Sequence, residues 1–511
     1  MALKRNLIAN FAGQGWVALV SLAFVPVYID RLGVEAYGLI GLYVVLQTWL
    51  SLLDLGMTPT LTREAARVSS GAHTPESIGD LVRSLEIVVF VLAAVIVLGI
   101  WCGSGAIASR WVRPLALSQE AVAGAVAVIA FVVAARFCEG IYRGALFGFE
   151  RQVFYNGVYA LISTFRYAGA AVLVIFVPSI VVFFWWQAGF SLLTVLLLAR
   201  AAHAALPTAS RRPRFSIEAL RRVGFFAGGM SLTALFALLF SQGDKIMLSR
   251  LVDLESFGIY MLAVALAGIF PMLAGPVASA YFPRLTAAVA AGDRAAERDL
   301  FRAGVQIVAL LAAPAVAICM LAGREIVIAW TGTPALANSI TPILGFVAIG
   351  AFCNAVLQIP FMLQLAHGWT TLSVRINLLG AALLLPAVYL GTRVNGVVGA
   401  AIAWASMNVL VLVLATIVMH RRLLPEQLLF FAAKGVAIPL AASSLAAGAV
   451  IISSGSTDHE RFVSLFIVVL AGLCALIGAG LTLDVGRRWL KHLVRQTLLP
   501  GLRPKNNGVT I

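Results

Sequence analysis

Long apolar runs separated by short polar stretches dominate this sequence. An α-helix needs about 20 apolar residues to cross the ~30 Å hydrocarbon core of a membrane, and spanning β-barrels would instead read as short alternating segments. The pattern therefore predicts an all-α polytopic membrane protein with about 14 transmembrane helices. The predicted spans are 7–29, 38–60, 81–102, 119–142, 153–177, 179–203, 224–249, 257–281, 302–322, 338–364, 370–391, 396–419, 430–452 and 462–484.

The composition agrees with this pattern. The chain has 511 residues, of which 61% are hydrophobic and only 12% charged, and its mean hydropathy is +0.97. A soluble domain needs far more charge at its surface, so this class is excluded. The five cysteines are scattered and form no spacing typical of a disulfide framework or a metal site.

The net charge of +15 has two readings, a nucleic-acid surface or the positive-inside bias of a membrane protein. The arginines gather in the loops after even-numbered spans, above all at 200–222, which favours the second reading. Both termini are then expected in the cytoplasm.

A short repeat divides the chain. Glu35-Ala-Tyr-Gly-Leu39 aligns with Glu255-Ser-Phe-Gly-Ile259 at an offset of 220 residues. This repeat predicts two six-helix bundles of the same topology, related by a pseudo-two-fold axis along the membrane normal, with two extra C-terminal helices. The expected domains are an N-terminal bundle at 1–206, a linker and second bundle at 207–422, the two extra helices at 423–484, and a basic amphipathic helix with a flexible cytoplasmic tail at 485–511.

Charged residues inside predicted spans are the candidate functional residues, because a charge in the membrane is costly and usually faces a partner or a water-filled space. Arg136, Glu139 and Arg143 share one helix face by their spacing. They form either a local ion pair or a cationic stripe. Asp244 and Lys245 are adjacent, so their side chains leave the helix about 100° apart and are not expected to face the same neighbour. The full set is Asp54, Arg136, Glu139, Arg143, Arg166, Asp244, Lys245 and Arg375.

Motifs of enzymes are absent from the sequence. It contains no Walker A motif, no HExxH and no Gly-x-Ser-x-Gly. The loops are also too short for a soluble catalytic domain. We therefore expect a protein that is not an enzyme.

Three stretches resemble the polysaccharide transport family. They are the run from Pro26 to Leu39, the run Leu52-Leu-Asp-Leu-Gly-Met57 with Arg63, and Asp244-Lys-Ile-Met-Leu248 followed by Phe257-Gly-Ile-Tyr260. The chain is similar here to the Wzx-type flippases of O-antigen and exopolysaccharide, within the superfamily that also holds multidrug extruders and the lipid II flippase. The resemblance covers roughly residues 1–420 in layout.

This resemblance implies a flippase that moves undecaprenyl-pyrophosphate-linked oligosaccharides across the inner membrane by alternating access. It implies no cofactor other than a coupling cation, either a proton or sodium, and suggests a polysaccharide polymerase and a chain-length regulator as protein partners. The pyrophosphate would meet the basic residues, whereas the acids would couple an ion or pair helices. The basic residues are Arg136, Arg143, Arg166, Lys245 and Arg375, and the acids are Asp54, Glu139 and Asp244.

Two rival functions share much of this pattern. A lipid II flippase or an ion-coupled drug exporter would have the same architecture. An exporter of cationic drugs should carry an excess of intramembrane acids, whereas here bases exceed acids. A membrane-embedded glycosyltransferase or ligase usually carries a large outward loop, and the loops after odd-numbered spans are short.

Overall fold

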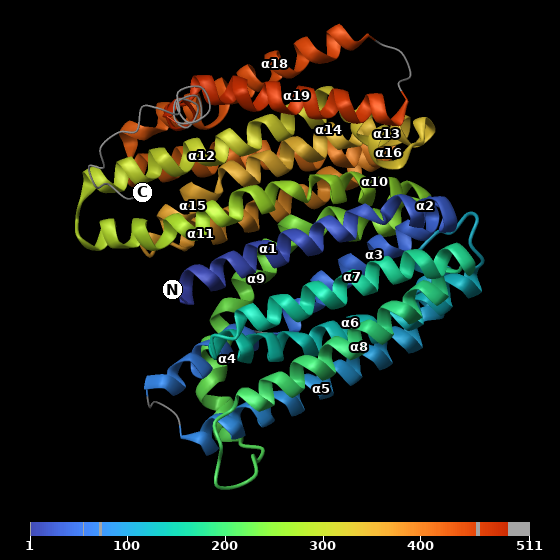
Figure 1. The fold of residues 1–511 in the computed structure, drawn as a ribbon, viewed down its shortest axis with the longest axis vertical. Coiled ribbons are helices and arrows are strands. Elements are labelled where there is room, and N and C mark those ends of the chain that lie inside the picture. The colour runs from blue at the N-terminus through green and yellow to red at the C-terminus, as the bar shows by residue number, and fades with distance from the viewer. Residues whose placement is uncertain (1, 55, 71–73, 456–459, 489–511) are drawn as a thin grey trace, which may run out of the picture. The chain divides into compact units, whose positions relative to one another are not determined.

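The computed structural model describes residues 2–54, 56–70, 74–455 and 460–488, and every regular element in these ranges is a helix (Figure 1). The all-α prediction is thereby confirmed. The chain divides into two compact units. Unit 1 is Met1–Ala265 with Asn377–Ala400, and unit 2 is Leu266–Ile376 with Ala401–Ile511.

Unit 1 is built around α6, whose small and apolar residues pack on the neighbouring α4, α5 and α8. The α1 helix runs beside α7, which in turn contacts α8 (Figure 1). The helices are α1 (Ala2–Ala23), α2 (Val25–Leu32), α3 (Val34–Leu50), η1 (Ser51–Asp54), α4 (Met57–Ala66), η2 (Arg67–Ser70), α5 (Pro75–Ala106), η3 (Ile107–Trp111), α6 (Gln119–Gly148), α7 (Gln152–Phe176), α8 (Ile180–Ala205), α9 (Ile217–Leu251), most of α10 (Leu254–Ala267) and the middle of α16 (Thr371–Arg422).

Unit 2 is built around α12, which contacts α11, α14, α18 and α19. Its helices are α11 (Ile269–Ala290), α12 (Arg294–Leu321), α13 (Gly323–Thr331), α14 (Pro334–Val356), α15 (Gln358–Ala366), the outer parts of α16 (Thr371–Arg422), η4 (Pro425–Gln427), α17 (Leu428–Phe430), η5 (Phe431–Ala437), α18 (Ile438–Ser454) and α19 (Arg461–Thr482).

The helices account for the predicted spans. Twelve helical stretches in the described residues are long and apolar enough to cross a membrane. One of them, α16, breaks at Asn395 and Gly396, where Gly396 has a φ of 53°. If α16 is divided at this break, it accounts for two predicted spans. The α9 helix accounts for the predicted span 224–249, so each of the fourteen predicted spans corresponds to a helix.

The second span ends earlier than the sequence suggested. We expected one helix over 38–60, but α3 ends at Leu50 and a separate helix, α4, begins at Met57. Gly56 stands between them with a φ of 79°, a left-handed conformation that glycine adopts without strain. The turn places Asp54 ahead of α4.

The compact units do not coincide with the boundaries expected at residues 206 and 422. The reason is that α9, although it follows the linker, packs on α3, α4 and α5 of the first half. The pseudo-two-fold relation between two bundles stays a prediction. The amphipathic helix expected at 485–499 lies largely outside the described residues, which reach residue 488.

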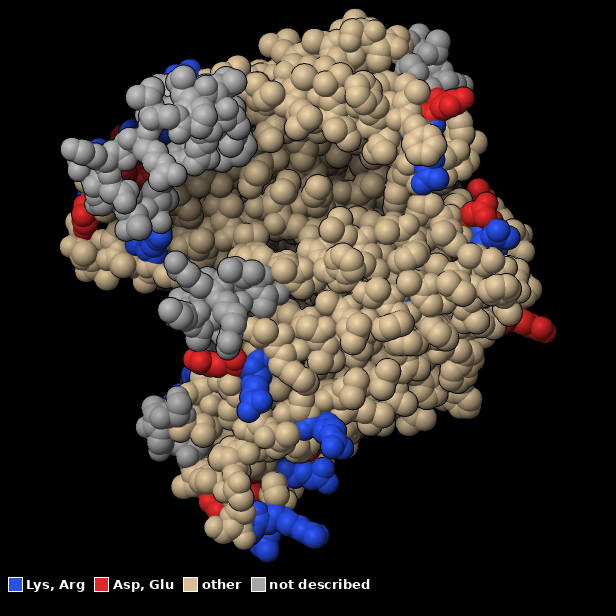
Figure 2. Space-filling model, in the orientation of Figure 1, with Lys and Arg blue, Asp and Glu red and all other residues tan. Residues whose placement is uncertain are grey.

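Apolar side chains cover the outside of both units. Phe176 in unit 1 is 78% exposed and Leu445 in unit 2 is 77% exposed. On the face that Figure 2 presents, charged side chains gather toward helix ends and the helix middles are apolar. Such a surface suits contact with lipid and not with water.

The two copies of the repeated turn pack against each other. A side chain at Gly38 would collide with the carbonyl oxygen of Leu254, and one at Gly258 would collide with that of Val34. Val34 and Leu254, like Gly38 and Gly258, are separated by the repeat offset of 220 residues. The same contact thus occurs twice with the partners exchanged, as at a two-fold axis, which supports the repeat.

Candidate functional site

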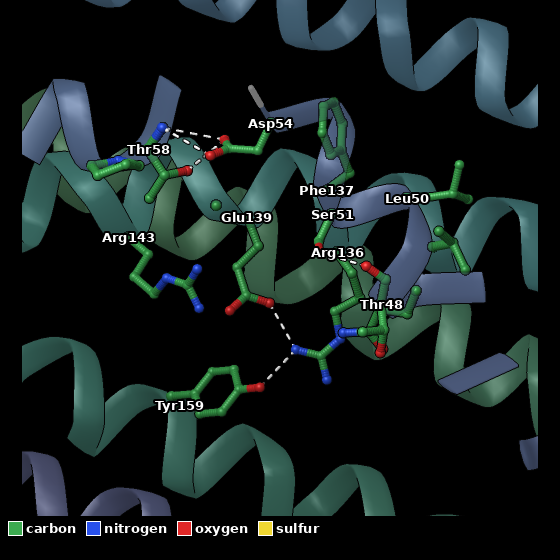
Figure 3. A pocket seen from close by; sticks show the side chains of 14 residues that line it. Thr48, Leu50, Ser51, Asp54, Thr58, Arg136, Phe137, Glu139, Arg143 and Tyr159 are labelled. Atoms are coloured by element: carbon green, nitrogen blue, oxygen red, sulfur yellow. Dashed lines mark hydrogen bonds and ion pairs between the residues drawn. The ribbon is translucent and has the colours of Figure 1, made fainter. Parts of the chain in front are cut away.

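A cavity of about 490 Å³ opens inside unit 1 (Figure 3). Its walls come from α3, η1, α4, α6 and α7. Its size falls in the range of roughly 300–1,000 Å³ that is usual for small-molecule sites. The lining residues are Gln47, Thr48, Leu50, Ser51, Asp54, Thr58, Pro59, Val133, Arg136, Phe137, Glu139, Gly140, Arg143 and Tyr159.

The α6 helix contributes the charged wall. Arg136, Glu139 and Arg143 all line the cavity, as expected from residues three and seven positions apart on one helix face. Arg136 Nη1 donates to Glu139 Oε2 at 2.7 Å. The two side chains are only 7% and 6% exposed. We call these two residues the cavity pair.

Two tyrosines of α7 complete the surroundings of the cavity pair. Arg136 Nη1 also donates to Tyr159 Oη at 2.8 Å, and Tyr155 Oη donates to Glu139 Oε1 at 3.1 Å. The tyrosine rings stack with their centroids 5.4 Å apart. Sequence reasoning missed both residues, although their spacing of four on a helix indicates a shared face.

Asp54 and α4 form the opposite wall. The Asp54 carboxylate accepts the backbone N–H of Thr58 at 3.2 Å and the Thr58 hydroxyl at 2.7 Å, so it holds the first turn of α4. A Cβ at Gly144 of α6 would lie 2.8 Å from the Thr58 carbonyl oxygen. The absent side chain therefore lets α4 approach α6 closely and brings Asp54 to the cavity.

The charges on the walls balance. Arg136 and Arg143 face Asp54 and Glu139, so the formal charge of the lining is zero. Of the two alternatives for α6, the structure shows the local ion pair between Arg136 and Glu139, and Asp54 from η1 offsets the charge of Arg143. Two donors remain available within the described part of the chain: Arg136 Nε is buried without a hydrogen-bond partner, and the exposed Arg143 makes no hydrogen bond or ion pair there.

Arg166 and Arg375 are not among the residues that line this cavity. Arg166 on α7 is 2% exposed, and its guanidinium lies over the Tyr167 ring at 4.8 Å and donates to the Tyr167 hydroxyl at 3.2 Å. Arg375 on α16 belongs to unit 2 and is exposed. The cavity thus brings together four of the eight candidate residues, and the functional roles of all eight stay predictions.

Asp244 and Lys245 of α9 form a second buried pair, which we call the enclosed pair. Lys245 Nζ lies 3.1 and 3.2 Å from the two carboxylate oxygens of Asp244 and 3.0 Å from the Ser241 carbonyl oxygen. Tyr260 Oη donates to Asp244 Oδ2 at 2.6 Å. Although the two side chains leave the helix in different directions, the long lysine chain folds back and meets its neighbour.

The arrangement of the cavity suits an anionic ligand with hydroxyl groups. Guanidinium groups bind phosphate and carboxylate oxygens in pairs. Gln47, Thr48 and Ser51 add neutral polar groups to the wall. Among the described residues, no group of three or more His, Cys, Asp or Glu side chains could hold a metal ion.

Comparisons with known proteins give a family and a fold. The model of a family described as polysaccharide biosynthesis protein matches residues 3–289. A candidate O-antigen transporter of Shigella flexneri is 21% identical over 411 residues, which cover 79% of this chain and 94% of that protein.

Two solved structures resemble the chain in fold. The lipid II flippase MurJ in an inward closed conformation matches with a TM-score of 0.73 and 12% identity, over 96% of this chain and 99% of that one. An inward-facing multidrug resistance transporter of the MATE family matches with a TM-score of 0.65 and 15% identity, over 82% of this chain and 96% of that one.

Proposed function

The chain belongs to the family of polysaccharide biosynthesis proteins, and within it we propose a flippase that moves undecaprenyl-pyrophosphate-linked oligosaccharides across the bacterial inner membrane. The similar proteins are transporters and flippases, in agreement with the expectation that this chain is not an enzyme. The fold supports transport by alternating access. A proton or sodium gradient would drive it.

The observation that carries this proposal is the cavity with Arg136 in its wall. Arg136 is more than nine-tenths buried in a predicted span, yet its Nε has no partner in the described residues. A buried guanidinium with a spare donor is a ready site for the oxygens of a pyrophosphate. Arg143, which is exposed and lines the same cavity, would meet the second phosphate.

The rest of the substrate would use the other features of the protein. The polyprenyl chain can remain in the bilayer beside the apolar outer face of the helices. Sugars nearest the phosphate would meet Gln47, Thr48 and the ring of Tyr159. With both termini in the cytoplasm, the oligosaccharide would be taken up from the cytoplasmic side and released to a polymerase and a chain-length regulator on the other side.

Genetic complementation tests the proposal. The gene is deleted in its host, and undecaprenyl-linked intermediates are extracted and identified by mass. Complete repeat units should accumulate and the surface polysaccharide should disappear. The wild-type gene should restore the polysaccharide, whereas Arg136→Gln should not. Arg110→Gln is the matched control, because Arg110 is exposed and does not line the cavity.

Other outcomes would identify a rival function. Accumulated lipid II with normal polysaccharide would indicate a lipid II flippase. Unchanged glycans with altered drug tolerance would indicate a drug exporter. A truncated repeat unit would indicate an enzyme of the assembly path.

A further inference from the structure

The loop that joins α8 to α9 is held along one face of α5. The backbone N–H groups of Ser210 and Ser216 donate to α5 side chains, the first to Glu76 Oε1 at 2.9 Å and the second to Ser84 Oγ at 2.8 Å. We call residues 206–216 the strap. Its two ends are thus bonded to the same helix.

Asp80 fixes the middle of the strap, four residues from each of the two acceptors and so on the same helix face. Its carboxylate oxygens accept both Nη groups of Arg211, at 2.9 and 2.5 Å, and one of them also accepts the backbone N–H of Arg214 at 2.7 Å. A Cβ at Gly79 would lie 3.2 Å from Pro213 Cγ, so the absent side chain lets the strap lie close to α5.

Arginines without a partner lie on the outside of this segment. Arg212, Arg214 and Arg221, the last in α9, are exposed, and their side chains make no hydrogen bond or ion pair within the described residues. Besides the ion pair in the middle of the strap, the acids here are Glu76 and Glu218, so positive charge is in excess. On the face that Figure 2 presents, basic side chains gather at this end of unit 1.

Two exposed apolar side chains accompany these arginines. Phe215 is 51% exposed and Ile217 is 61% exposed. The headgroup region of a bilayer accepts aromatic and aliphatic side chains beside basic ones, whereas water does not favour them. The strap directly follows α8, which is long and apolar enough to cross a membrane. It is therefore expected at the depth of the lipid headgroups.

We propose that the strap and the first turns of α9 form a docking surface for anionic phospholipids of the surrounding membrane. The arginines bind the phosphate oxygens of the headgroups, and Phe215 and Ile217 enter the bilayer between them. With both termini in the cytoplasm, this is the inner leaflet. The inference goes beyond the proposed function, because these lipids are not transported and the cavity takes no part in binding them.

Lipid binding to the full-length chain tests this inference. Protein in a neutral detergent is titrated with phosphatidylglycerol and, separately, with phosphatidylcholine, and native mass spectrometry counts the lipids bound. Phosphatidylglycerol should bind more tightly. The double variant Arg212→Gln/Arg214→Gln should weaken its tightest binding by about 10- to 30-fold and leave phosphatidylcholine unchanged. Equal affinity of the wild type for the two lipids would overturn the inference.

Matched variants separate this surface from net charge. Arg110→Gln/Arg113→Gln removes the same charge from exposed positions of unit 1 outside the strap, and should bind phosphatidylglycerol as the wild type does. Equal weakening in both double variants would mean that net charge alone attracts the lipid, against the inference. Phe215→Ala/Ile217→Ala keeps every charge and should weaken binding about tenfold. Unchanged affinity there would also count against it.

The same assay distinguishes other anions. Inorganic phosphate offers similar oxygens but no acyl chains, so an excess should not displace phosphatidylglycerol. Displacement would indicate a site for soluble phosphate and overturn lipid docking. Binding of undecaprenyl phosphate without binding of phosphatidylglycerol would indicate a surface for the transported lipid instead. Should thermal unfolding show that the double arginine variant does not fold, Arg221→Gln takes its place, with an expected weakening of about fivefold.

Discussion

The cavity pair on α6 and the enclosed pair on α9 are both acid–base pairs within predicted membrane spans, and their surroundings differ. Arg136 and Glu139 line a cavity, and Arg136 keeps a donor without a partner in the described residues. Asp244 is fully buried and is bonded by both Lys245 and Tyr260. A charge inside the membrane is therefore not by itself a binding site. Access to a ligand and a spare hydrogen-bonding group make the difference.

The largest expected effect is on stability at the enclosed pair. Asp244→Ala should leave the Lys245 ammonium buried without its counter-ion and destabilise the protein by about 3–5 kcal/mol. Thermal unfolding of purified protein in detergent measures the loss. Glu255→Ala, at an exposed position near by, should unfold at the wild-type temperature. Equal melting of both variants would contradict the view that the pair is enclosed.

Breaking the cavity pair should affect transport more than stability. Arg136→Gln should abolish surface polysaccharide while lowering the free energy of unfolding by about 1–3 kcal/mol, because the remaining Glu139 lines a cavity and keeps its hydrogen bond from Tyr155. Protein amounts in the membrane and glycan export are measured together. A folded variant that exports normally would remove Arg136 from the site.

Matched tyrosine variants sharpen the same comparison. Tyr260→Phe removes the 2.6 Å hydrogen bond to Asp244 and should cost about 1–2 kcal/mol of stability. Tyr159→Phe removes the 2.8 Å hydrogen bond from Arg136, and should change stability less and pyrophosphate affinity more. Thermal unfolding and binding titrations on both variants check this division. If Tyr260→Phe changed pyrophosphate affinity more and Tyr159→Phe changed stability more, the enclosed pair would be the binding site and the cavity pair would be structural.

Arg143 should give the smallest effect. It is exposed and unpaired in the described residues, so Arg143→Gln should change the free energy of unfolding by less than about 0.5 kcal/mol. Affinity for pyrophosphate should fall about three- to tenfold. A salt titration provides the check, since loss of an exposed cation should reduce the salt dependence of binding. Unchanged affinity would place the phosphates at Arg136 alone.

The helices and part of the site could be predicted from local patterns. Apolar runs of about 20 residues mark the spans, and the spacing of Arg136, Glu139 and Arg143 places them on one face of α6. Tyr155, Tyr159 and Asp54 could not be assigned to the same site, because they come from other helices. Their meeting with α6 depends on packing between helices.

Two glutamates of the repeated turn also show that packing between distant segments decides the surroundings of a residue. Glu35 and Glu255 occupy equivalent positions of the repeat. Glu35 is buried and accepts the backbone N–H groups of Leu115, Ala116 and Leu117 at 2.5–3.0 Å, whereas Glu255 is exposed. Nothing in the repeated residues distinguishes the two, because the partner of Glu35 is a loop distant in the chain.

By itself, the sequence determined which segments form apolar helices and which charges share a helix face, because both follow from helix geometry and from the cost of polar groups in lipid. Only the tertiary structure decided which charges reach the cavity and which are enclosed. It also decided that Asp54 neutralises the lining, and that Arg136 keeps a donor free beside its bond to Glu139. These features depend on distances between segments far apart in the chain, which the helix period alone does not contain.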